Sequence, residues 1–202
     1  MAWKTEQWMR DVFPGSEMIY EEYRALPRRE LAVVAGAVLD SALAELLAKR
    51  LAGPSGEIHA FLGVNGDGRA PCGSFGARIQ LALLTSIITE GDAALLRAIK
   101  NIRNQFAHEV HADFTSASVL PLIERVHDLH FQRLATLLSA EDLAKAHSSR
   151  SSIKSALASN PEAGAGLLLG VFAVYQAYFH RLFDRVSPIL PFPLRPLDRA
   201  EG

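Results

Sequence analysis

The stretch Leu95–Val110, LLRAIKNIRNQFAHEV, repeats its apolar residues at the spacing of an α-helix. Successive apolar positions are separated by four, three, four and four residues, which brings them onto one side of a helix. The positions on this stripe are Leu95, Ile99, Ile102, Phe106 and Val110. Such a stripe has to be covered by other elements, so we expect this helix to lie at the centre of the fold.

The polar residues of the same stretch divide between two sides of the helix. Arg103 falls on the shoulder of the apolar stripe, whereas Asn104 and His108, four residues apart, share the opposite side. Ala107 leaves room beside them for another segment to approach closely. The stretch therefore predicts a helix with one buried face and one polar face.

The rest of the chain shows the same helical periodicity, and no run alternates apolar and polar residues as a β-strand does. We predict an all-α, single-domain bundle of about seven to eight helices over residues 1–186, followed by a proline-rich tail at 187–202. The expected helices cover residues 3–13, 17–25, 28–51, the segment from a Ser74 cap to 88, the segment from an Asp92 cap to 110, 118–138, a segment from 139, and 161–186. A glycine-rich connection at 63–78 is expected to be the least helical part.

Composition narrows the classes of function. A chain of 202 residues with 49% hydrophobic and 21% charged side chains is typical of a soluble globule, and a net charge of −1 argues against a surface built for duplex nucleic acid. The single cysteine, Cys72, excludes an internal disulfide and fits a reducing compartment, so we expect a cytoplasmic protein. Residues 163–179 are nearly all apolar but shorter than the roughly twenty residues of a membrane span, which favours a buried helix without membrane association.

Arg103, Asn104 and His108 form a set that suits metal-independent RNA cleavage. A histidine can move a proton to or from the ribose hydroxyl or the leaving oxygen, and an arginine can stabilise the negative charge of the transition state. In this stretch four residues separate the arginine from the histidine, and the first of the four is polar. This spacing resembles the signature of the HEPN superfamily, helical domains that include many dimeric endoribonucleases. Under that resemblance Arg103 and His108 are the catalytic residues.

A structural role is equally compatible with these residues. Asn104 and His108 can hydrogen-bond the backbone of the glycine-rich connection. Arg103 can pair with one of three carboxylates, Asp40, Glu45 or Glu90. Buried polar groups without partners cost about 1–3 kcal/mol, so a fully paired set would have a structural reason to exist.

A longer pattern adds two further segments to the comparison. An alanine-rich helix containing Asp40 is followed by GSFGARI at Gly73–Ile79 and then by IRNQFAH at Ile102–His108. This order resembles the mannitol operon repressor (MltR) family over about residues 28–114. The resemblance implies an all-helical transcriptional repressor without an obvious DNA-reading element, acting through protein partners. The sequence agrees with that absence, because no pair of short helices joined by a tight turn has a basic second helix.

The GSFG turn opens a helix whose free N–H groups, together with the guanidinium of Arg78, offer a pocket for an anion. The residues of this expected ligand site are Asp40, Ser74, Arg78 and Asn104. The alternative is internal, with Phe75 filling a gap in the core and Arg78 paired with Asp40. The anion interpretation requires the turn and the polar side of the 92–110 helix to form one pocket.

Other candidate sites are weaker. His127, Asp128 and His130 can place two imidazoles on one helix face, but no second pair of ligands follows, so we expect no metal. The glycine-rich connection lacks the Gly-Lys-Ser/Thr of a phosphate loop, and no cofactor is expected. The sequence favours a regulator that forms a homodimer and binds a protein partner rather than a specific DNA site. A HEPN-type ribonuclease acting on RNA and an anion-sensing module are the alternatives.

Overall fold

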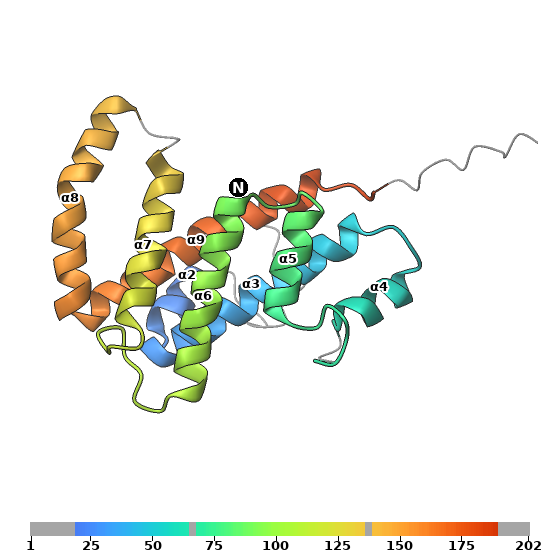
Figure 1. Cartoon of the computed structure of the whole chain (residues 1–202), viewed down its shortest axis with the longest axis horizontal. Coiled ribbons are helices and arrows are strands. Elements are labelled where there is room, and N and C mark those ends of the chain that lie inside the picture. The colour runs from blue at the N-terminus through green and yellow to red at the C-terminus, as the bar shows by residue number, and fades with distance from the viewer. Residues whose placement is uncertain (1–18, 65–67, 136–138, 190–202) are drawn as a thin grey trace, which may run out of the picture.

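The structure, a computed structural model, describes residues 19–64, 68–135 and 139–189. Its elements are α2 (Ile19–Ala25), α3 (Arg28–Arg50), α4 (Ser55–Leu62), α5 (Phe75–Leu84), α6 (Glu90–His108), α7 (Leu120–Ala135), α8 (Ala140–Ser159) and α9 (Pro161–Arg185) (Figure 1). These residues form eight helices and no strand, which confirms the expected all-α bundle. The expected helix at 3–13 and the tail beyond 189 lie outside the described residues.

The two longest helices, α3 and α9, lie side by side and run in the same direction. At their N-terminal ends, Arg28 donates to a carboxylate oxygen of Glu162 at 2.6 Å. At their C-terminal ends, Lys49 donates to the carbonyl oxygen of Phe183. Both helices are long and apolar enough to cross a membrane, yet each buries much of its apolar surface inside the bundle. They form the central layer of the fold.

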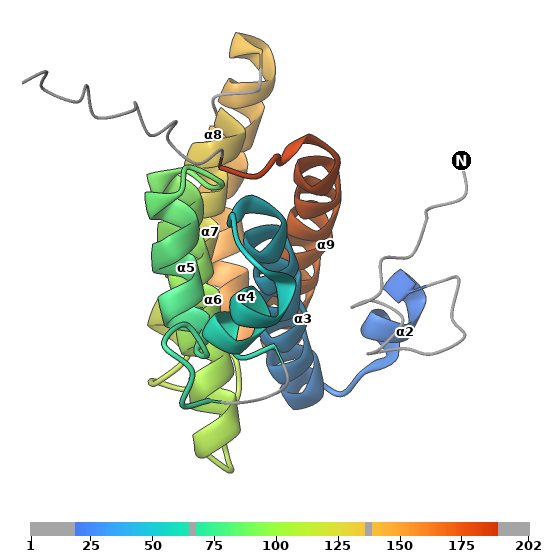
Figure 2. The same cartoon turned by 90° about the vertical axis from the view of Figure 1, so that its right-hand side faces the viewer.

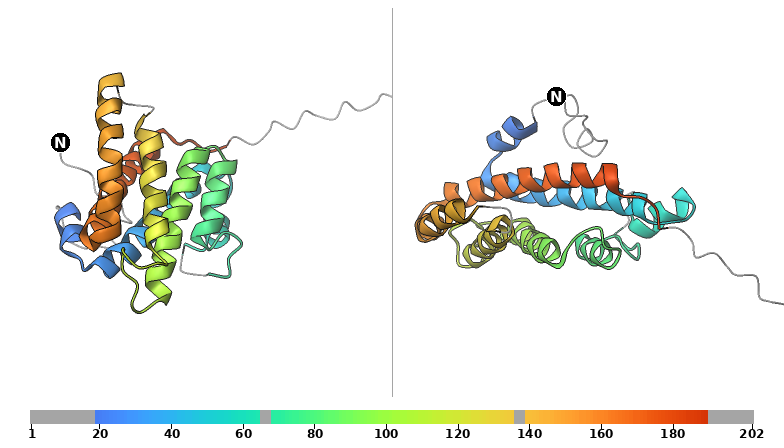
Figure 3. Two further views of the ribbon diagram at one scale, coloured as in Figure 1. Left: turned by 60° about the vertical axis from the view of Figure 1, so that its left-hand side comes forward. Right: turned by 90° about the horizontal axis from the view of Figure 1, so that it is seen from above.

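Four further helices, α5, α6, α7 and α8, form a second layer against one side of α3 and α9, as the view from above shows (Figure 3). Within it α5 and α7 flank α6, and α3 covers the apolar stripe of α6. On the other side of α9 lies α2 (Figure 2). The Tyr23 ring of α2 meets the Phe172 ring of α9 edge-on. Among the described residues, no helix covers the outer side of α5 and α6.

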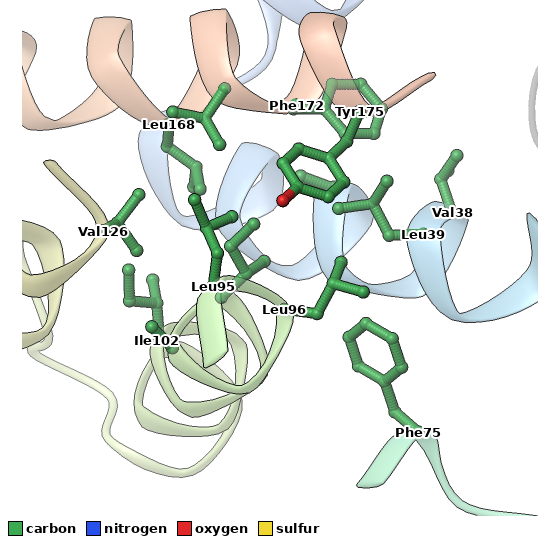
Figure 4. Packing of buried hydrophobic residues seen from close by; sticks show 14 of the residues in the cluster. Val38, Leu39, Phe75, Leu95, Leu96, Ile102, Val126, Leu168, Phe172 and Tyr175 are labelled. Atoms are coloured by element: carbon green, nitrogen blue, oxygen red, sulfur yellow. The ribbon is translucent and has the colours of Figure 1, made fainter. Parts of the chain in front are cut away.

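The core is one continuous cluster of apolar side chains between these layers (Figure 4). Leu95 and Ile102 of α6, Val126 of α7, Leu39 of α3 and Phe172 of α9 all belong to this cluster, and all five are buried. Burying one large apolar side chain contributes about 1.5–3 kcal/mol. Packing of the helix faces, rather than any one polar contact, therefore holds the bundle together.

Capping determines where α5 and α6 begin. Ser74 caps α5 as expected, since its hydroxyl accepts the backbone N–H of Ala77 at 3.2 Å. The expected cap of α6 was wrong, because Thr89 and not Asp92 occupies that position. Asp92 lies at the third helical position and accepts the backbone N–H of Thr89 at 3.1 Å, which completes a capping box.

Three other expectations about secondary structure are corrected. Helix α5 ends at Leu84 rather than near residue 88, because Ser86 takes a φ of 57°, which no α-helix accommodates. Residues 55–62, which we did not expect to be helical, form α4. Val110 is 75% exposed although its spacing placed it on the buried stripe, because α6 ends at His108 and the chain turns away.

Candidate functional site

Arg78, in the first turn of α5, directs its guanidinium into the protein. The residue is 7% exposed. Its Nε donates to the carbonyl oxygens of Leu62 at 3.3 Å and Cys72 at 3.1 Å, and its Nη2 donates to Leu62 at 2.7 Å and Gly63 at 3.5 Å. Its Nη1 donates to Oδ1 of Asp40 at 2.6 Å. One arginine thereby joins the end of α4, the loop before α5 and the middle of α3.

Asp40, the ionic partner of Arg78, has 16% of its side chain exposed. Burial raises the pKa of its carboxyl above the ordinary value, and the charges of Arg78 and Arg103 act in the opposite direction. Removing one partner from a pair in such a position leaves the other charge uncompensated in the interior. The internal pairing that the sequence left open is therefore present in the structure.

Arg103 lies on the side of α6 that faces α3, at the point where α3 has a glycine. A Cβ atom at Gly36 would lie 2.7 Å from Cδ and 2.9 Å from Cβ of Arg103, so the arginine stem occupies the space of a side chain there. Asp40 follows Gly36 by one helical turn, and its carboxylate attracts the Arg103 charge. Among the described residues, the Arg103 guanidinium makes no hydrogen bond, so Asp40 attracts it without binding it directly.

Asn104 and His108 lie on the outer side of α6, and both are exposed. Within the part of the chain that the structure describes, neither side chain forms a hydrogen bond. Immediately after His108, Arg29 of α3 donates to the carbonyl oxygens of Glu109 at 3.2 Å and Val110 at 2.7 Å. These bonds hold the two residues that follow α6 against α3, while the outer side chains of α6 remain available.

The structure brings together three of the residues singled out from the sequence. Asp40, Arg78 and Arg103 gather where α3, α5 and α6 meet. Ser74 lies in the turn before Arg78, and its hydroxyl serves as the cap of α5. Asn104 is on the exposed side of α6, whereas the Arg78 guanidinium points inward, so these two groups do not face each other.

Arg103 and His108, the two expected catalytic residues, lie on different sides of α6. The stem of Arg103 packs against Gly36 of α3, and His108 faces solvent. Joint action on one phosphate would therefore need groups from two copies of the chain, because a general acid or base must reach its proton at hydrogen-bonding distance.

A second polar cluster, which we did not expect from the sequence, joins α6, α7 and α9 around the buried Asp92. Its Oδ1 accepts from Tyr175 at 2.8 Å and from Arg133, and its Oδ2 accepts from Tyr178 at 3.2 Å. The Arg133 guanidinium lies 4.8 and 4.3 Å from the centroids of the two tyrosine rings. Burial raises the pKa of Tyr175 to about 12, against the effect of the Arg133 charge. Every group here already has a partner, which makes the cluster a structural junction.

Asp128 of α7 connects α7 to α8. Its carboxylate accepts from Arg150 at 2.7 Å and from Lys154 at 3.0 Å, and Nδ1 of His127 lies 3.4 Å away. Burial by itself would raise the pKa of Asp128, but the hydrogen bonds from these three residues lower it to about 2. The carboxylate therefore stays charged at neutral pH and holds two cations of α8.

The histidines considered for metal binding, and the single cysteine, have surroundings that suit a structural role. In the described ranges, no group of three or more His, Cys, Asp or Glu side chains could hold a metal ion. His127 is buried, and burial lowers the pKa of the His130 ring, with a further contribution from His127. Burial raises the pKa of the Cys72 thiol, which keeps it from the thiolate form that a nucleophile requires.

Comparison with protein-family models, with curated proteins and with solved structures finds no match for this chain. A functional proposal therefore rests on the fold and on the positions of the residues named above. They define a helical bundle with an internal ion pair between α3 and α5 and an uncovered polar side on α6.

Proposed function

We propose that the protein is a transcriptional regulator of the mannitol operon repressor type that acts through a protein partner. The supporting observation is that the polar residues of the IRNQFAH segment lie on two different sides of α6. Arg103 packs against α3, whereas Asn104 and His108 stand exposed without hydrogen-bond partners among the described residues. Polar side chains presented on a rigid, capped helix suit contact with another macromolecule.

Direct reading of DNA is not part of this proposal. Binding to duplex DNA depends on the number of phosphates that cations neutralise, and a recognition helix must enter the major groove. On the outer side of α6, the permanent cations are Arg97 and Lys100, and Arg97 already donates to Oε1 of Gln80 at 2.7 Å. The proposal includes a cytoplasmic location. It also includes a homodimer, and sedimentation equilibrium would measure the mass of that dimer.

Deleting the gene in native cells and comparing transcripts tests the regulatory role. We expect the transcripts of a small set of genes to change and the wild-type gene to restore them. An Asn104→Ala/His108→Ala double variant, present at equal abundance, should fail to restore them. Arg125→Ala, at an exposed position on α7, is the matched control and should behave as wild type. Unchanged transcripts after deletion would overturn the proposal.

Binding to DNA is tested separately with fragments from upstream of the responding genes. The purified protein should form no sequence-specific complex with them. A tight complex that survives raised salt would contradict the need for a partner, because non-specific phosphate contacts weaken steeply as salt increases.

A metal-independent ribonuclease is the second candidate, supported by the exposed and unbonded position of His108. The test is incubation of the purified protein with single-stranded RNA in the presence of a chelator. We expect the RNA to remain intact. Cleavage that is lost in His108→Ala and kept in Arg125→Ala would make the ribonuclease the better assignment.

A further inference from the structure

We propose that the partner of this regulator docks through an acidic segment on the outer face of α5 and α6. This inference rests on the proposed function, because it names the chemistry of the partner that the regulator binds. Six residues define the surface, which we term the α5–α6 face: Gln80, Arg97, Lys100, Asn101, Asn104 and His108.

The distribution of charge is the first reason for an acidic partner. No acidic residue occurs in α5, and none occurs in α6 between Asp92 and Glu109. The carboxylates of α6, Glu90 and Asp92, precede Arg97 by seven and five residues, and neither Arg97 nor Lys100 forms an ion pair with a described carboxylate. The whole chain has a net charge of −1, so this excess of positive charge is local. At about 0.1 M salt, charges act over about 10 Å, which limits their effect to groups docked on this face.

The arrangement of the side chains is the second reason. Along α6, Arg97, Asn101, Asn104 and His108 follow at spacings of four, three and four, which places them in one row. Nη2 of Arg97 donates to Gln80 of α5 at 2.7 Å. A Cβ atom at Gly76 would lie 3.7 Å from Nζ of Lys100, so the amine reaches over the first turn of α5. The cations thus lie between two helices whose outer side no described helix covers (Figure 3).

The surroundings of these cations favour a protein segment over a nucleic acid. Proteins that bind single strands usually stack the bases on exposed aromatic rings. The aromatic residues of α5 and α6, Phe75 and Phe106, are both buried in the core. At the end of α5, one helical turn beyond Gln80, Leu84 is 71% exposed and offers an apolar contact. An acidic peptide with an apolar side chain fits this combination.

Fluorescence anisotropy with labelled poly-L-glutamate tests the charge requirement on the full chain. We expect saturable binding at low salt that an Arg97→Glu/Lys100→Glu double variant weakens at least about tenfold, because like charges placed opposite each other oppose docking. Arg125→Glu/Arg181→Glu makes the same change in net charge at exposed positions of α7 and α9, and should stay within about twofold of wild type. Equal weakening in the two double variants would overturn the proposal.

Charged replacements of Asn104 test the docking site in a way that separates weaker binding from loss of the fold. The Asn104 side chain is exposed and makes no hydrogen bond with a described residue, so neither of two charged replacements should unfold the helix. Asn104→Lys should tighten the binding of poly-L-glutamate, and Asn104→Glu should weaken it. Identical affinities of these variants would contradict the proposed docking site. Stronger binding to poly(U) RNA than to poly-L-glutamate, lost in Arg97→Glu/Lys100→Glu, would assign the face to nucleic acid and overturn the proposal.

The cellular experiment separates this inference from the regulatory role. Arg97→Glu/Lys100→Glu should fail to restore the transcripts of the deletion strain, and Arg125→Glu/Arg181→Glu should restore them. If deletion changes the transcripts but poly-L-glutamate does not bind, the regulatory role stands and the acidic partner is wrong. If poly-L-glutamate binds at the α5–α6 face but deletion leaves every transcript unchanged, the regulatory role fails, and with it the partner.

Discussion

Nη1 of Arg78 lies 2.6 Å from Oδ1 of Asp40, and this ion pair joins the first turn of α5 to the middle of α3. The same guanidinium also donates to the carbonyl oxygens of Leu62 and Cys72. The pair therefore positions the loop between α4 and α5 as well as the two helices.

Replacing Asp40 tests the stabilising role of this pair. Asp40→Ala should lower the free energy of unfolding by about 3–5 kcal/mol, because the Arg78 charge would remain in the interior without a counter-charge. Ser41 is the next residue and is exposed, so Ser41→Ala should change the free energy of unfolding by less than about 0.5 kcal/mol. Urea denaturation followed by circular dichroism measures both. Similar small losses in the two variants would show that Arg78 does not depend on Asp40.

Gly36 marks a close approach of α3 and α6. A Cβ atom there would lie 2.7 to 2.9 Å from Arg103, so Gly36→Ala should destabilise the fold by about 1–3 kcal/mol despite the higher helix propensity of alanine. In α9, a Cβ atom at Gly170 would meet no neighbouring group within 4 Å, and Gly170→Ala should stabilise the fold by about 0.5–1 kcal/mol. Thermal unfolding compares the two variants. Shifts of the same sign and size would contradict this helix contact.

The raised pKa of Tyr175 predicts that the protein becomes less stable at alkaline pH. Burial raises the pKa of this side chain from the ordinary 10.0 to about 12. A group whose pKa is higher in the folded than in the unfolded state makes its full contribution to stability at pH values below the unfolded pKa. The contribution of Tyr175 should therefore decrease as the pH rises from 10.0 to about 12. Tyr175→Phe cannot ionise, and its melting temperature should fall less steeply over that range. Parallel curves for the two proteins would exclude Tyr175 as the cause.

Asp128 predicts a local effect on α8. Asp128→Asn weakens the attachment of Arg150 and Lys154, so amide hydrogens of α8 should exchange faster while those of α3 keep their protection. Because the pKa of Asp128 is lowered from 3.8 to about 2, its contribution should be complete above pH 3.8 and disappear as the pH falls toward 2. Hydrogen exchange read by mass spectrometry measures both changes. Uniformly faster exchange in all helices would point to global destabilisation instead.

Features that depend on local chemistry could be predicted from the sequence. The all-α class follows from periodicity, and the Ser74 cap of α5 follows from the ability of a serine hydroxyl to accept a helix N–H. The pairing of Arg78 with Asp40 was one of two open alternatives, since both residues lay in segments expected to meet. The exposed position of Val110 could not be derived from spacing, because the apolar pattern continues past the point where α6 ends.

The cluster around Asp92 depends on how distant helices pack. Its partners Arg133, Tyr175 and Tyr178 lie 41 to 86 residues further along the chain, and no local pattern connects them. One clue was present: Asp92 lies three residues before Leu95, on the apolar stripe of α6. A carboxylate on a buried stripe needs a hydrogen-bonding partner, so a buried cation or hydroxyl could have been anticipated, although not which one.

The parallel pairing of α3 with α9 has a consequence for synthesis on the ribosome. Arg28 and Glu162, which join the starts of the two helices, are 134 residues apart. The apolar surface that α9 covers on α3 stays open in the nascent chain until Pro161–Arg185 has emerged, and contacts of this sequence separation form slowly. Chains released before residue 161 should therefore aggregate or engage chaperones, whereas the finished chain should not.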